Sequence, residues 1–331
     1  MKTVCMLGEG AWGTAVATVL AHNGIKVKLW CQDPSVANCI KTQHRNERYF
    51  PYFALNSLIE PVTDIKQALS GVTYVFVSTP VKYFRSVLEQ AGDSIYEDQI
   101  WICLNKGIEN ETLLFPSQII NDVCDCSVRT AVLAGPSFAY DLAAKRVTAV
   151  TIAADDCDLA SQIQGLMANE YFRPYTTDDI VGVQLGAALK NVMALAVGIA
   201  DGAGMTDNTT AFLLTRGISE IAQLVKRRGG RIQTVYGLSG IGDTIMTAMS
   251  KLSRNRQVGL LLGQGKSLAT IQQERPVLPE GINTVRSMYQ MMERHGLELP
   301  ICHGVYNIVF HGSTIHELVA SLMARSLEPE C

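Results

Sequence analysis

The sequence predicts a doubly wound α/β domain followed by an all-helical domain. In the first half of the chain, short apolar runs alternate with helical stretches, and a glycine-rich turn stands where the first run meets the first helix. From about residue 180 onward the apolar positions follow a helical period instead. We therefore expect an α/β domain over residues 1–179 and a helical domain over residues 180–331.

The strands expected in the first domain are short apolar or β-branched runs closed by turn residues, as in a buried parallel sheet. They cover 3–7, 26–30, 73–80, 100–107, 130–135 and 148–155, with a further short strand near Tyr171. A helix over 13–23, stopped by Gly24, links the first two strands. Sheets of this kind bind ligands at the carboxyl ends of their strands.

The helices expected in the second domain cover 180–202, 207–228, 240–252, 255–263, 280–295 and 301–311. The first of them is long enough to cross a membrane. However, Lys190 and Asn191 lie near its centre, where a charged and a polar side chain are costly in lipid. We expect a buried helix of a soluble protein.

Composition narrows the class of protein. The 331 residues carry a formal charge of -3, which argues against a general polyanion binder. The nine cysteines are scattered and form no CxxC pair, so we expect neither a metal site nor a disulfide framework, and a reducing cytoplasm suits them. The apolar run that ends at Leu7 is too short for a signal peptide.

The glycine-rich turn reads Gly8-Glu9-Gly10-Ala11-Trp12-Gly13 and fits the G-x-G-x-x-G pattern between a strand and a helix. In a Rossmann-type domain the first glycine permits the tight turn, the second lets a pyrophosphate approach the backbone, and the third allows close packing of helix and strand. This context predicts a dinucleotide site. The alternative is an ordinary glycine-rich turn.

The end of the second strand bears on the choice between NAD and NADP. Gln32 and Asp33 stand there, and a carboxylate at this place holds the ribose 2′-hydroxyl of NAD, whereas an arginine accommodates the 2′-phosphate of NADP. Asp33 also precedes Pro34 and could simply begin a turn. Both cofactors stay open at this point.

Two lysines are candidate catalytic groups. Lys190 lies on an almost wholly apolar helix, and burial disfavours the charged ammonium, which suits proton transfer. Lys106, in LNKGIE, follows a central strand at the ligand edge. The alternatives are a lysine at a helix edge with its ammonium in water, and a solvated turn lysine.

Two further segments are candidate ligand contacts. AGPSFA (134–139) opens onto a helix, where Ser137 could cap the helix or contact a ligand. LSGIGDTIMTAMSKLSRNR (238–256) combines Asp243 with a cluster of serine, arginine and asparagine that suits a phosphate or a carboxylate. A plain helix start and a solvated helix end are the respective alternatives.

These segments occur in the order found in one enzyme family. GxGxWGTA, NERYFP (46–51), NKGIE, GPSFA, LKN, GIGD, SRN and PEG (279–281) resemble the motifs of bacterial NAD(P)-dependent glycerol-3-phosphate dehydrogenase, and the resemblance runs from residue 4 to about 310. It implies interconversion of dihydroxyacetone phosphate and sn-glycerol 3-phosphate with NAD(H) or NADP(H) for phospholipid synthesis. It also implies a second domain of the 6-phosphogluconate dehydrogenase type.

The resemblance also implies roles for residues at matching positions. Lys190 corresponds to the proton donor and acceptor, Lys106 to a second substrate lysine, and Asp243 to an aspartate that could pair with the catalytic lysine. The substrate contacts it implies are Lys106, Gly135, Ser137, Lys190, Asn191, Asp243, Thr247, Ser253, Arg254 and Asn255. The cofactor contacts it implies are Gly8, Gly10, Ala11, Trp12, Gly13, Gln32, Asp33, Lys106, Ala139, Arg254, Leu278 and Glu280.

The chain departs from the family pattern at two places near the cofactor. Glu9 replaces the usual alanine, and because a carboxylate repels a pyrophosphate we expect its side chain to face solvent. Cys31 and Gln32 stand where the family commonly has an arginine, which favours NAD or dual use. We expect a cytoplasmic homodimer with no nucleic acid partner.

Two other functions remain open. A dehydrogenase of the β-hydroxyacid or 6-phosphogluconate type would share the architecture, but its substrate carries a carboxylate. A silent NAD-binding sensor would keep the glycines and lose the chemistry. Retention of Lys106, Lys190, Asp243 and Arg254 argues against the sensor.

Overall fold

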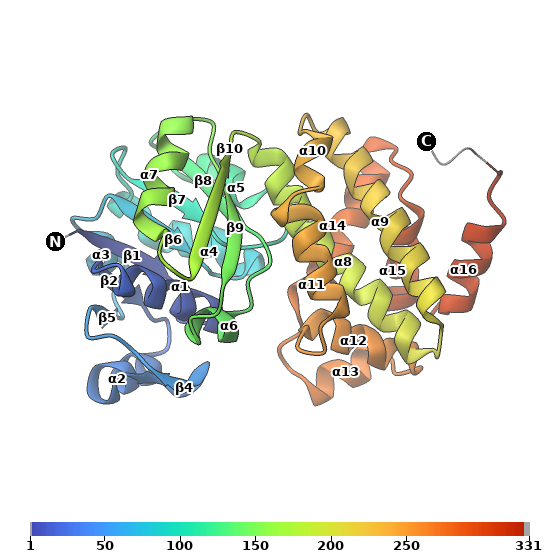
Figure 1. Cartoon of the computed structure of the whole chain (residues 1–331), viewed down its shortest axis with the longest axis horizontal. Coiled ribbons are helices and arrows are strands. Elements are labelled where there is room, and N and C mark those ends of the chain that lie inside the picture. The colour runs from blue at the N-terminus through green and yellow to red at the C-terminus, as the bar shows by residue number, and fades with distance from the viewer. Residues whose placement is uncertain (1, 328–331) are drawn as a thin grey trace. The chain divides into compact units, whose positions relative to one another are not determined.

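The computed structural model describes residues 2–327, and the chain divides into two compact units (Figure 1). Unit 1 runs to Lys106 and continues over Leu114–Gln184. Unit 2 consists of Gly107–Leu113 and the chain from Leu185 onward. Gly107–Leu113 therefore lies in unit 2, although it falls inside the stretch expected to form only the first domain.

Unit 1 contains an eight-stranded sheet of order β10-β9-β8-β7-β6-β1-β2-β5. Neighbouring strands are parallel except β8 and β9, which are antiparallel. The strands are β1 (Thr3–Leu7), β2 (Lys26–Trp30), β5 (Ile59–Val62), β6 (Tyr74–Val77), β7 (Ile100–Cys103), β8 (Arg129–Ala134), β9 (Thr148–Ala153) and β10 (Phe172–Thr177). The predicted doubly wound sheet is confirmed, with β10 as the short strand near Tyr171.

Two of the expected strands are shorter than their apolar runs. β6 ends at Val77 and β7 at Cys103, and the residues that follow leave the sheet as loops at its carboxyl edge. A small antiparallel pair, β3 (Arg45–Asn46) and β4 (Phe50–Ala54), was not predicted, nor was β5. β3 is two residues long, too short to produce a pattern of its own.

Helices cover both faces of this sheet. Alternate residues of β1 point to opposite sides, and Val4 and Met6 belong to the buried cluster that includes α1, α2 and α7. On the other side α4 packs against both α3 and α5. The helices of unit 1 are α1 (Ala11–His22), α2 (Pro34–Gln43), α3 (Ile65–Leu69), α4 (Val81–Ala91), α5 (Pro116–Val123), α6 (Ala139–Ala143) and α7 (Cys157–Met167), with a 3₁₀ turn η1 (Gly92–Ser94).

In unit 2 the described secondary structure is helical, and all six expected helices have counterparts there. The helices are α8 (Ile180–Gly202), whose first turn belongs to unit 1, α9 (Asp207–Arg227), α10 (Ile232–Val235), α11 (Asp243–Met249), α12 (Arg254–Gly263), α13 (Leu268–Glu274), α14 (Glu280–His295), α15 (Pro300–His311) and α16 (Ile315–Met323). The helix expected over 240–252 is present with other bounds: a π-helical turn η2 (Leu238–Gly242) runs directly into α11, which stops at Met249. The sequence did not predict α10, α13 or α16.

Helix α8 is the core helix of unit 2. Among the described residues it alone is long and apolar enough to cross a membrane, and 94% of its most apolar window is buried inside the protein. Ala194 and Val197 of α8 pack with Ala248 of α11 in an apolar cluster. A buried core helix explains the apolar composition without a membrane.

Helices α8 and α12 approach each other through glycines. A Cβ added at Gly198 would lie 2.2 Å from the carbonyl oxygen of Arg256, and one added at Gly259 would lie 2.3 Å from that of Leu195. Gly202 and Gly263 make similarly close approaches to the backbone of the other helix. The two backbones are therefore in direct contact, which fixes where α12 begins relative to α8.

Polar contacts at two places complete unit 2. Glu220 of α9 is buried and accepts hydrogen bonds from the backbone amides of Ile301 (2.7 Å) and Cys302 (3.2 Å), so it caps the start of α15. Ser287 of α14 donates to the carbonyl oxygen of Ile108 (2.8 Å), and Asn110 donates to Asn283 (2.6 Å). These bonds attach Gly107–Leu113 to α14.

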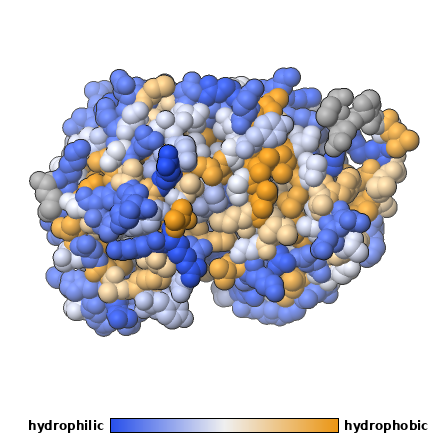
Figure 2. Space-filling view, viewed as in Figure 1, coloured by the Kyte–Doolittle hydropathy of each residue, from blue (hydrophilic) through white to orange (hydrophobic). Residues whose placement is uncertain are grey.

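Hydrophobic residues also reach the surface of unit 2, as Figure 2 shows on the face drawn there. The exposed large hydrophobic side chains of this unit include Tyr236, Ile245 and Met249. Scattered exposed apolar residues are common on proteins, so their presence alone assigns no partner.

Candidate functional site

The glycine-rich turn connects β1 to α1 at the carboxyl edge of the sheet. Gly8 has a φ of +114°, a conformation that side chains with a Cβ rarely adopt. A Cβ at Gly13 would lie 2.2 Å from the carbonyl oxygen of Gly8, so α1 packs directly on the end of β1. A Cβ at Gly10 would meet nothing within 4 Å. The space beside Gly10 fits the backbone approach that a pyrophosphate requires.

Asn46 stabilises this turn through hydrogen bonds. Its side chain is fully buried and donates to the carbonyl oxygen of Glu9 (2.7 Å) and to the hydroxyl of Thr14 (2.9 Å). The Thr14 hydroxyl donates to the same carbonyl oxygen at 3.0 Å. The NERYFP segment is part of the family resemblance, but the sequence assigns Asn46 no role of its own. Nothing near Asn46 in the sequence indicates a hydrogen-bond partner 37 residues away.

The expectation that Glu9 faces solvent is wrong. Its side chain is 9% exposed, and its two carboxylate oxygens accept hydrogen bonds from the backbone amides of Gln32 (3.4 Å) and Asp33 (3.3 Å). These amides lie just past the end of β2 and donate outward from the sheet. The carboxylate faces them because N–H groups donate hydrogen bonds to its charged oxygens.

Asp33 is both a helix cap and an ion-pair partner. Its carboxylate accepts from the Ser35 amide at 2.8 Å as the N-cap of α2, and it pairs with the Arg48 guanidinium. Hydrogen bonds from Ser35, and then the charge of Arg48, lower the pKa of the Asp33 carboxyl. The adjacent Gln32 side chain is exposed. Asp33 therefore begins α2 through one carboxylate oxygen, and its other oxygen pairs with Arg48.

Lys106, Gly135 and Ser137 lie together at the same edge of the sheet. The Lys106 ammonium donates to the Gly135 carbonyl oxygen at 3.1 Å, and the Ser137 hydroxyl donates to that oxygen at 2.8 Å. The Lys106 nitrogen also lies 5.8 Å from the centre of the Trp12 ring. Trp12 Nε1 is buried, with no hydrogen-bond partner among residues 2–327. A bound polar group would satisfy it.

Ser137 does not cap a helix. Helix α6 begins at Ala139 with Phe138 as its N-cap, and no side chain caps it. α6 packs against α1, in which Ala11 is the first residue. Ala11 and Ala139 are both half-buried small residues of these contacting helices.

In unit 2 the candidate residues gather around α8. Lys190, on α8, forms an ion pair with Asp243, the first residue of α11. Lys190 is 6% exposed and Asp243 is fully buried. The hydroxyl of Thr247, one turn further along α11, donates to Asp243 at 3.2 Å. The pair places an ammonium, which can donate a proton, beside its counter-charge in a buried environment.

The π-helical turn before α11 explains how Asp243 reaches Lys190. A Cβ added at Gly240 would lie 2.0 Å from the Val235 carbonyl oxygen, so the turn folds tightly onto α10. A Cβ added at Gly186 of α8 would lie 2.8 Å from the Ser239 carbonyl oxygen. Small residues on both sides let the turn lie against α8, with Asp243 directly after it.

Helix α12 begins with the SRN segment. Ser253 is the N-cap and accepts from the Arg256 amide at 3.2 Å, while the Arg254 side chain is exposed. The buried side chain of Asn255 donates to Asn191 of α8 at 2.9 Å and accepts from the Gly281 amide at 2.9 Å. Asn191, Asn255 and the start of α14 are thereby tied together.

Leu278 and Glu280 stand at the start of α14, on either side of its N-cap Pro279. Both are half-buried, and Glu280 is the first helical residue. Within unit 2, therefore, the candidates occupy the middle of α8 and the starts of α11, α12 and α14. In unit 1 they occupy the carboxyl edge of the sheet.

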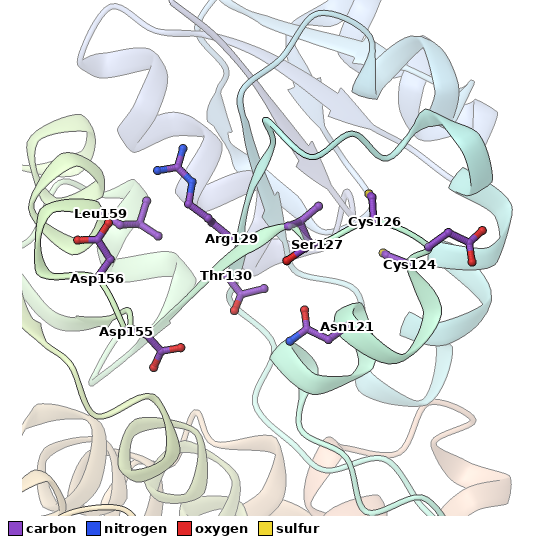
Figure 3. Close-up of a pocket in the computed structure, with 11 residues that line it drawn as sticks. Asn121, Cys124, Cys126, Ser127, Arg129, Thr130, Asp155, Asp156 and Leu159 are labelled. Carbon is purple, nitrogen blue, oxygen red and sulfur yellow. The ribbon is translucent and has the colours of Figure 1, made fainter.

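A surface hollow in unit 1 contains none of the candidate residues (Figure 3). Its walls come from the end of α5, the start of β8 and the loop before α7; they include Asn121, Cys124, Arg129, Asp155 and Asp156. It opens at the amino end of β8, opposite the edge that carries the glycine turn. Residues 2–327 hold no cluster of three or more His, Cys, Asp or Glu suited to a metal ion.

Comparison with known proteins gives a consistent result. Two family models match the chain: the NAD-dependent glycerol-3-phosphate dehydrogenase N-terminus over residues 3–160 and the C-terminus over residues 179–320. Glycerol-3-phosphate dehydrogenase (NAD(P)+) of Bacillus cytotoxicus is 40% identical over 327 residues, covering 98% of this chain and 96% of that protein. The Bacillus subtilis (strain 168) enzyme is also 40% identical, with 98% and 95% covered. A crystal structure of glycerol-3-phosphate dehydrogenase from Coxiella burnetii matches with a TM-score of 0.93 and 31% identity, covering 98% of this chain and 99% of that one.

Proposed function

The chain belongs to the NAD-dependent glycerol-3-phosphate dehydrogenase family, and from this we propose that Lys190 is the general acid and base of its reaction. The enzyme interconverts dihydroxyacetone phosphate and sn-glycerol 3-phosphate with an NAD(P) cofactor. The bound nicotinamide supplies or accepts the hydride. The protein must hold the substrate, move one proton at its C2 oxygen and exclude water.

The buried Lys190–Asp243 pair is the observation that supports this role. In ketone reduction the Lys190 ammonium donates a proton to the C2 oxygen, and in alcohol oxidation the neutral amine takes it back. Asp243 balances the ammonium charge inside the helical unit, where an unpaired cation would be costly. Thr247 fixes the Asp243 carboxylate through its hydroxyl.

We further propose that the start of α12 binds the substrate phosphate. The first amides of a helix point at an anion placed there, and the helix dipole favours negative charge. Arg254 has an exposed guanidinium that can contact two phosphate oxygens at once. Asn255 is hydrogen-bonded to Asn191 of α8 and to the Gly281 amide, and these bonds fix the position of this helix start relative to α8.

Lys106, Gly135 and Ser137 serve the same reaction from unit 1 in this proposal. Lys106 supplies a second cation for negative charge that develops on the C2 oxygen. Its hydrogen bond to the Gly135 carbonyl oxygen, which Ser137 shares, sets the direction of the ammonium. The Trp12 ring 5.8 Å away limits water around Lys106.

The cofactor contacts proposed for unit 1 are Gly8, Gly10, Ala11, Trp12, Gly13, Gln32, Asp33, Lys106 and Ala139. The open space at Gly10 supports the pyrophosphate position, and the exposed Gln32 just past β2 supports the ribose position. Arg254, Leu278 and Glu280 are proposed as cofactor contacts from unit 2. Ser253 is proposed as a substrate contact.

The biological setting is proposed on the same basis. We expect a cytoplasmic homodimer that supplies sn-glycerol 3-phosphate for phospholipid synthesis. The eight described cysteines are all free thiols, which suits a reducing compartment. Light scattering of the purified protein tests the dimer. A strain that lacks the gene should need added glycerol 3-phosphate for growth.

The direct test is oxidation of NADH and of NADPH, in parallel, by purified protein given dihydroxyacetone phosphate. Turnover that depends on this substrate supports the reaction, whereas turnover only with 2-keto acids supports a hydroxyacid dehydrogenase. Lys190→Ala should lower turnover by about 10²- to 10⁴-fold and leave NADH binding intact. The exposed Lys226 offers a matched control, since Lys226→Ala removes the same charge elsewhere in unit 2. An unchanged turnover number in Lys190→Ala would refute the assignment.

A further inference from the structure

We propose that the Glu9 carboxylate, acting with Asp33, makes this protein bind NADH in preference to NADPH. The proposal rests on the family's use of an NAD(P) cofactor and deepens the proposed function at the same site. It is independent of the role given to Lys190, since it concerns binding of the cofactor alone.

The position of Glu9 is the first step. Its carboxylate lies 3.4 Å from the Gln32 amide and 3.3 Å from the Asp33 amide, just past the end of β2. In Rossmann-type domains the residues at this place contact the 2′-hydroxyl of NAD or the 2′-phosphate of NADP. Glu9 therefore lies beside the one atom group in which the two cofactors differ.

The second step concerns the hydrogen-bond donors. A 2′-phosphate has three acceptor oxygens and a charge of about -1.5 to -2 at neutral pH, so it needs amides or cations around it. The amides of Gln32 and Asp33 would suit it, but both already donate to Glu9. A 2′-phosphate would have to displace one carboxylate while lying next to another. A 2′-hydroxyl carries no charge and can donate to a carboxylate.

The nearby cation is also engaged. An arginine near this place can bind a 2′-phosphate, but the guanidinium of Arg48 pairs with Asp33. Counting Glu9, Asp33 and Arg48 at one charge each leaves one net negative charge at the end of β2. Such a site repels a phosphate and accepts a hydroxyl.

A buried thiol supports this distribution of charge. Burial, and after it the negative charges of Glu9 and Asp33, together raise the pKa of the Cys31 thiol to about 12. Cys31 directly follows β2, so the two carboxylates act together at this point of the chain.

Glu9 cannot easily turn away to admit a phosphate. Its carbonyl oxygen is held by both Asn46 and Thr14, and its side chain is 9% exposed. Moving the carboxylate to solvent would break its two hydrogen bonds and leave two amides without acceptors. The preference is therefore built into the turn rather than into a mobile surface side chain.

The test is a titration of the purified protein with NADH and with NADPH in the absence of substrate. The fluorescence of the nucleotide reports its binding. We expect the wild-type Kd for NADPH to exceed that for NADH at least tenfold at low salt. Glu9→Gln removes the charge but keeps the shape, and should lower this ratio at least tenfold. Raising the salt concentration should lower the wild-type ratio more than the variant ratio, because salt screens the repulsion.

Two further variants sharpen the result. Glu97→Gln removes an equal charge from an exposed position of unit 1 and should leave the ratio unchanged. Asp33→Asn keeps a good N-cap while freeing Arg48, so Glu9→Gln with Asp33→Asn should favour NADPH more than either single change. Thermal denaturation of each variant verifies its fold.

Three outcomes would overturn the proposal. They are equal wild-type affinity for the two cofactors, a Glu9→Gln variant that keeps the wild-type ratio, and a Glu9→Gln variant that loses both cofactors alike, which would make Glu9 a structural residue of the turn. Failure to reduce dihydroxyacetone phosphate would contradict the proposed function instead, and the binding ratio would still decide the role of Glu9.

Discussion

Lys190 and Asp243 form an ion pair inside the helical unit although 53 residues separate them in the chain. Removing one partner of such a pair leaves a buried charge without its counter-charge. We predict that Asp243→Asn disfavours the Lys190 ammonium and lowers the rate of ketone reduction by about 10²-fold at neutral pH. Reduction needs the ammonium, so its pH–rate profile should lose activity at lower pH than in the wild type. Turnover measured from pH 5 to 9 checks this.

The control for Asp243 is Asp207→Asn, which removes an exposed carboxylate in the first turn of α9. This variant should keep the wild-type profile. If Asp243→Asn kept both the wild-type rate and the wild-type profile, the carboxylate would have no part in the chemistry.

A second prediction concerns the phosphate. Arg254→Ala should raise the KM for dihydroxyacetone phosphate about 30-fold, because a hydrogen bond to a charged group contributes about 2 kcal/mol. Activity with unphosphorylated dihydroxyacetone should not change. Initial rates with the two ketones measure this, with Arg275→Ala as a control on an exposed arginine of the same unit. Equal losses with both ketones would contradict a phosphate-binding role.

A third prediction concerns the contact between α8 and α12. Gly259→Ala places a methyl group 2.3 Å from the Leu195 carbonyl oxygen, and backbone on both sides cannot yield without moving a helix. We expect a loss of about 1–3 kcal/mol of stability, as for overpacked cores. The KM for the phosphorylated substrate should rise as well, because α12 carries Arg254. Thermal denaturation and initial rates provide the two readouts.

Gly165→Ala is the matched control for this substitution. Gly165 lies inside α7, and a Cβ there would meet nothing within 4 Å. Alanine is the better helix former, so this variant should gain about 0.5–1 kcal/mol of stability. A Gly259→Ala variant as stable as the wild type would show that the helices are not in tight contact.

A fourth prediction concerns pH and stability. Burial raises the pKa of the Glu220 carboxyl to about 7, even though the amides of Ile301 and Cys302 favour its charged form. A carboxyl whose pKa is higher in the folded than in the unfolded protein stabilises the fold below about pH 4.5 and loses that contribution as the pH rises through 7. Glu220→Gln should therefore be more stable than the wild type at pH 8, by up to about 3 kcal/mol, and similar to it at pH 5.

Thermal denaturation of wild type and Glu220→Gln at several pH values between 5 and 8 measures this difference. Glu293→Gln, at an exposed position of α14, should follow the wild type throughout. Parallel pH curves for wild type and Glu220→Gln would show that Glu220 does not titrate in this range.

The fold could be predicted because its signals are local. The glycine turn, the apolar runs of β1 and β7 and the helical period of α8 and α14 all lie within short windows of sequence. The helix expected over 240–252 is present, but Gly240 lies against the Val235 carbonyl oxygen, the first turn is π-helical and the helix stops at Met249. A glycine marks such a turn only when its neighbour in space is known.

The candidate site was predicted less completely for the same reason. The residue types and their order indicated Lys190 and Asp243, but the environment of Glu9 depends on two amides beyond β2 and on Asn46. A single carboxylate in a glycine turn carries no local sign of where its side chain points. Its orientation follows from contacts between segments more than 20 residues apart.

Gly107–Leu113 gives the protein an order of assembly. The partners of this segment lie on α14, up to 183 residues later: Asn283 and Ser287 bind Ile108 and Asn110, and Arg294 donates to Glu111. During synthesis this segment leaves the ribosome before α14 has been made. Its hydrogen bonds to α14 therefore form only after the later part of the chain has been added. A cut after Gln184 leaves every residue of the α/β half in one piece but separates Gly107–Leu113 from α14. Isolated residues 1–184 would therefore leave Ile108 and Asn110 without these hydrogen-bond partners.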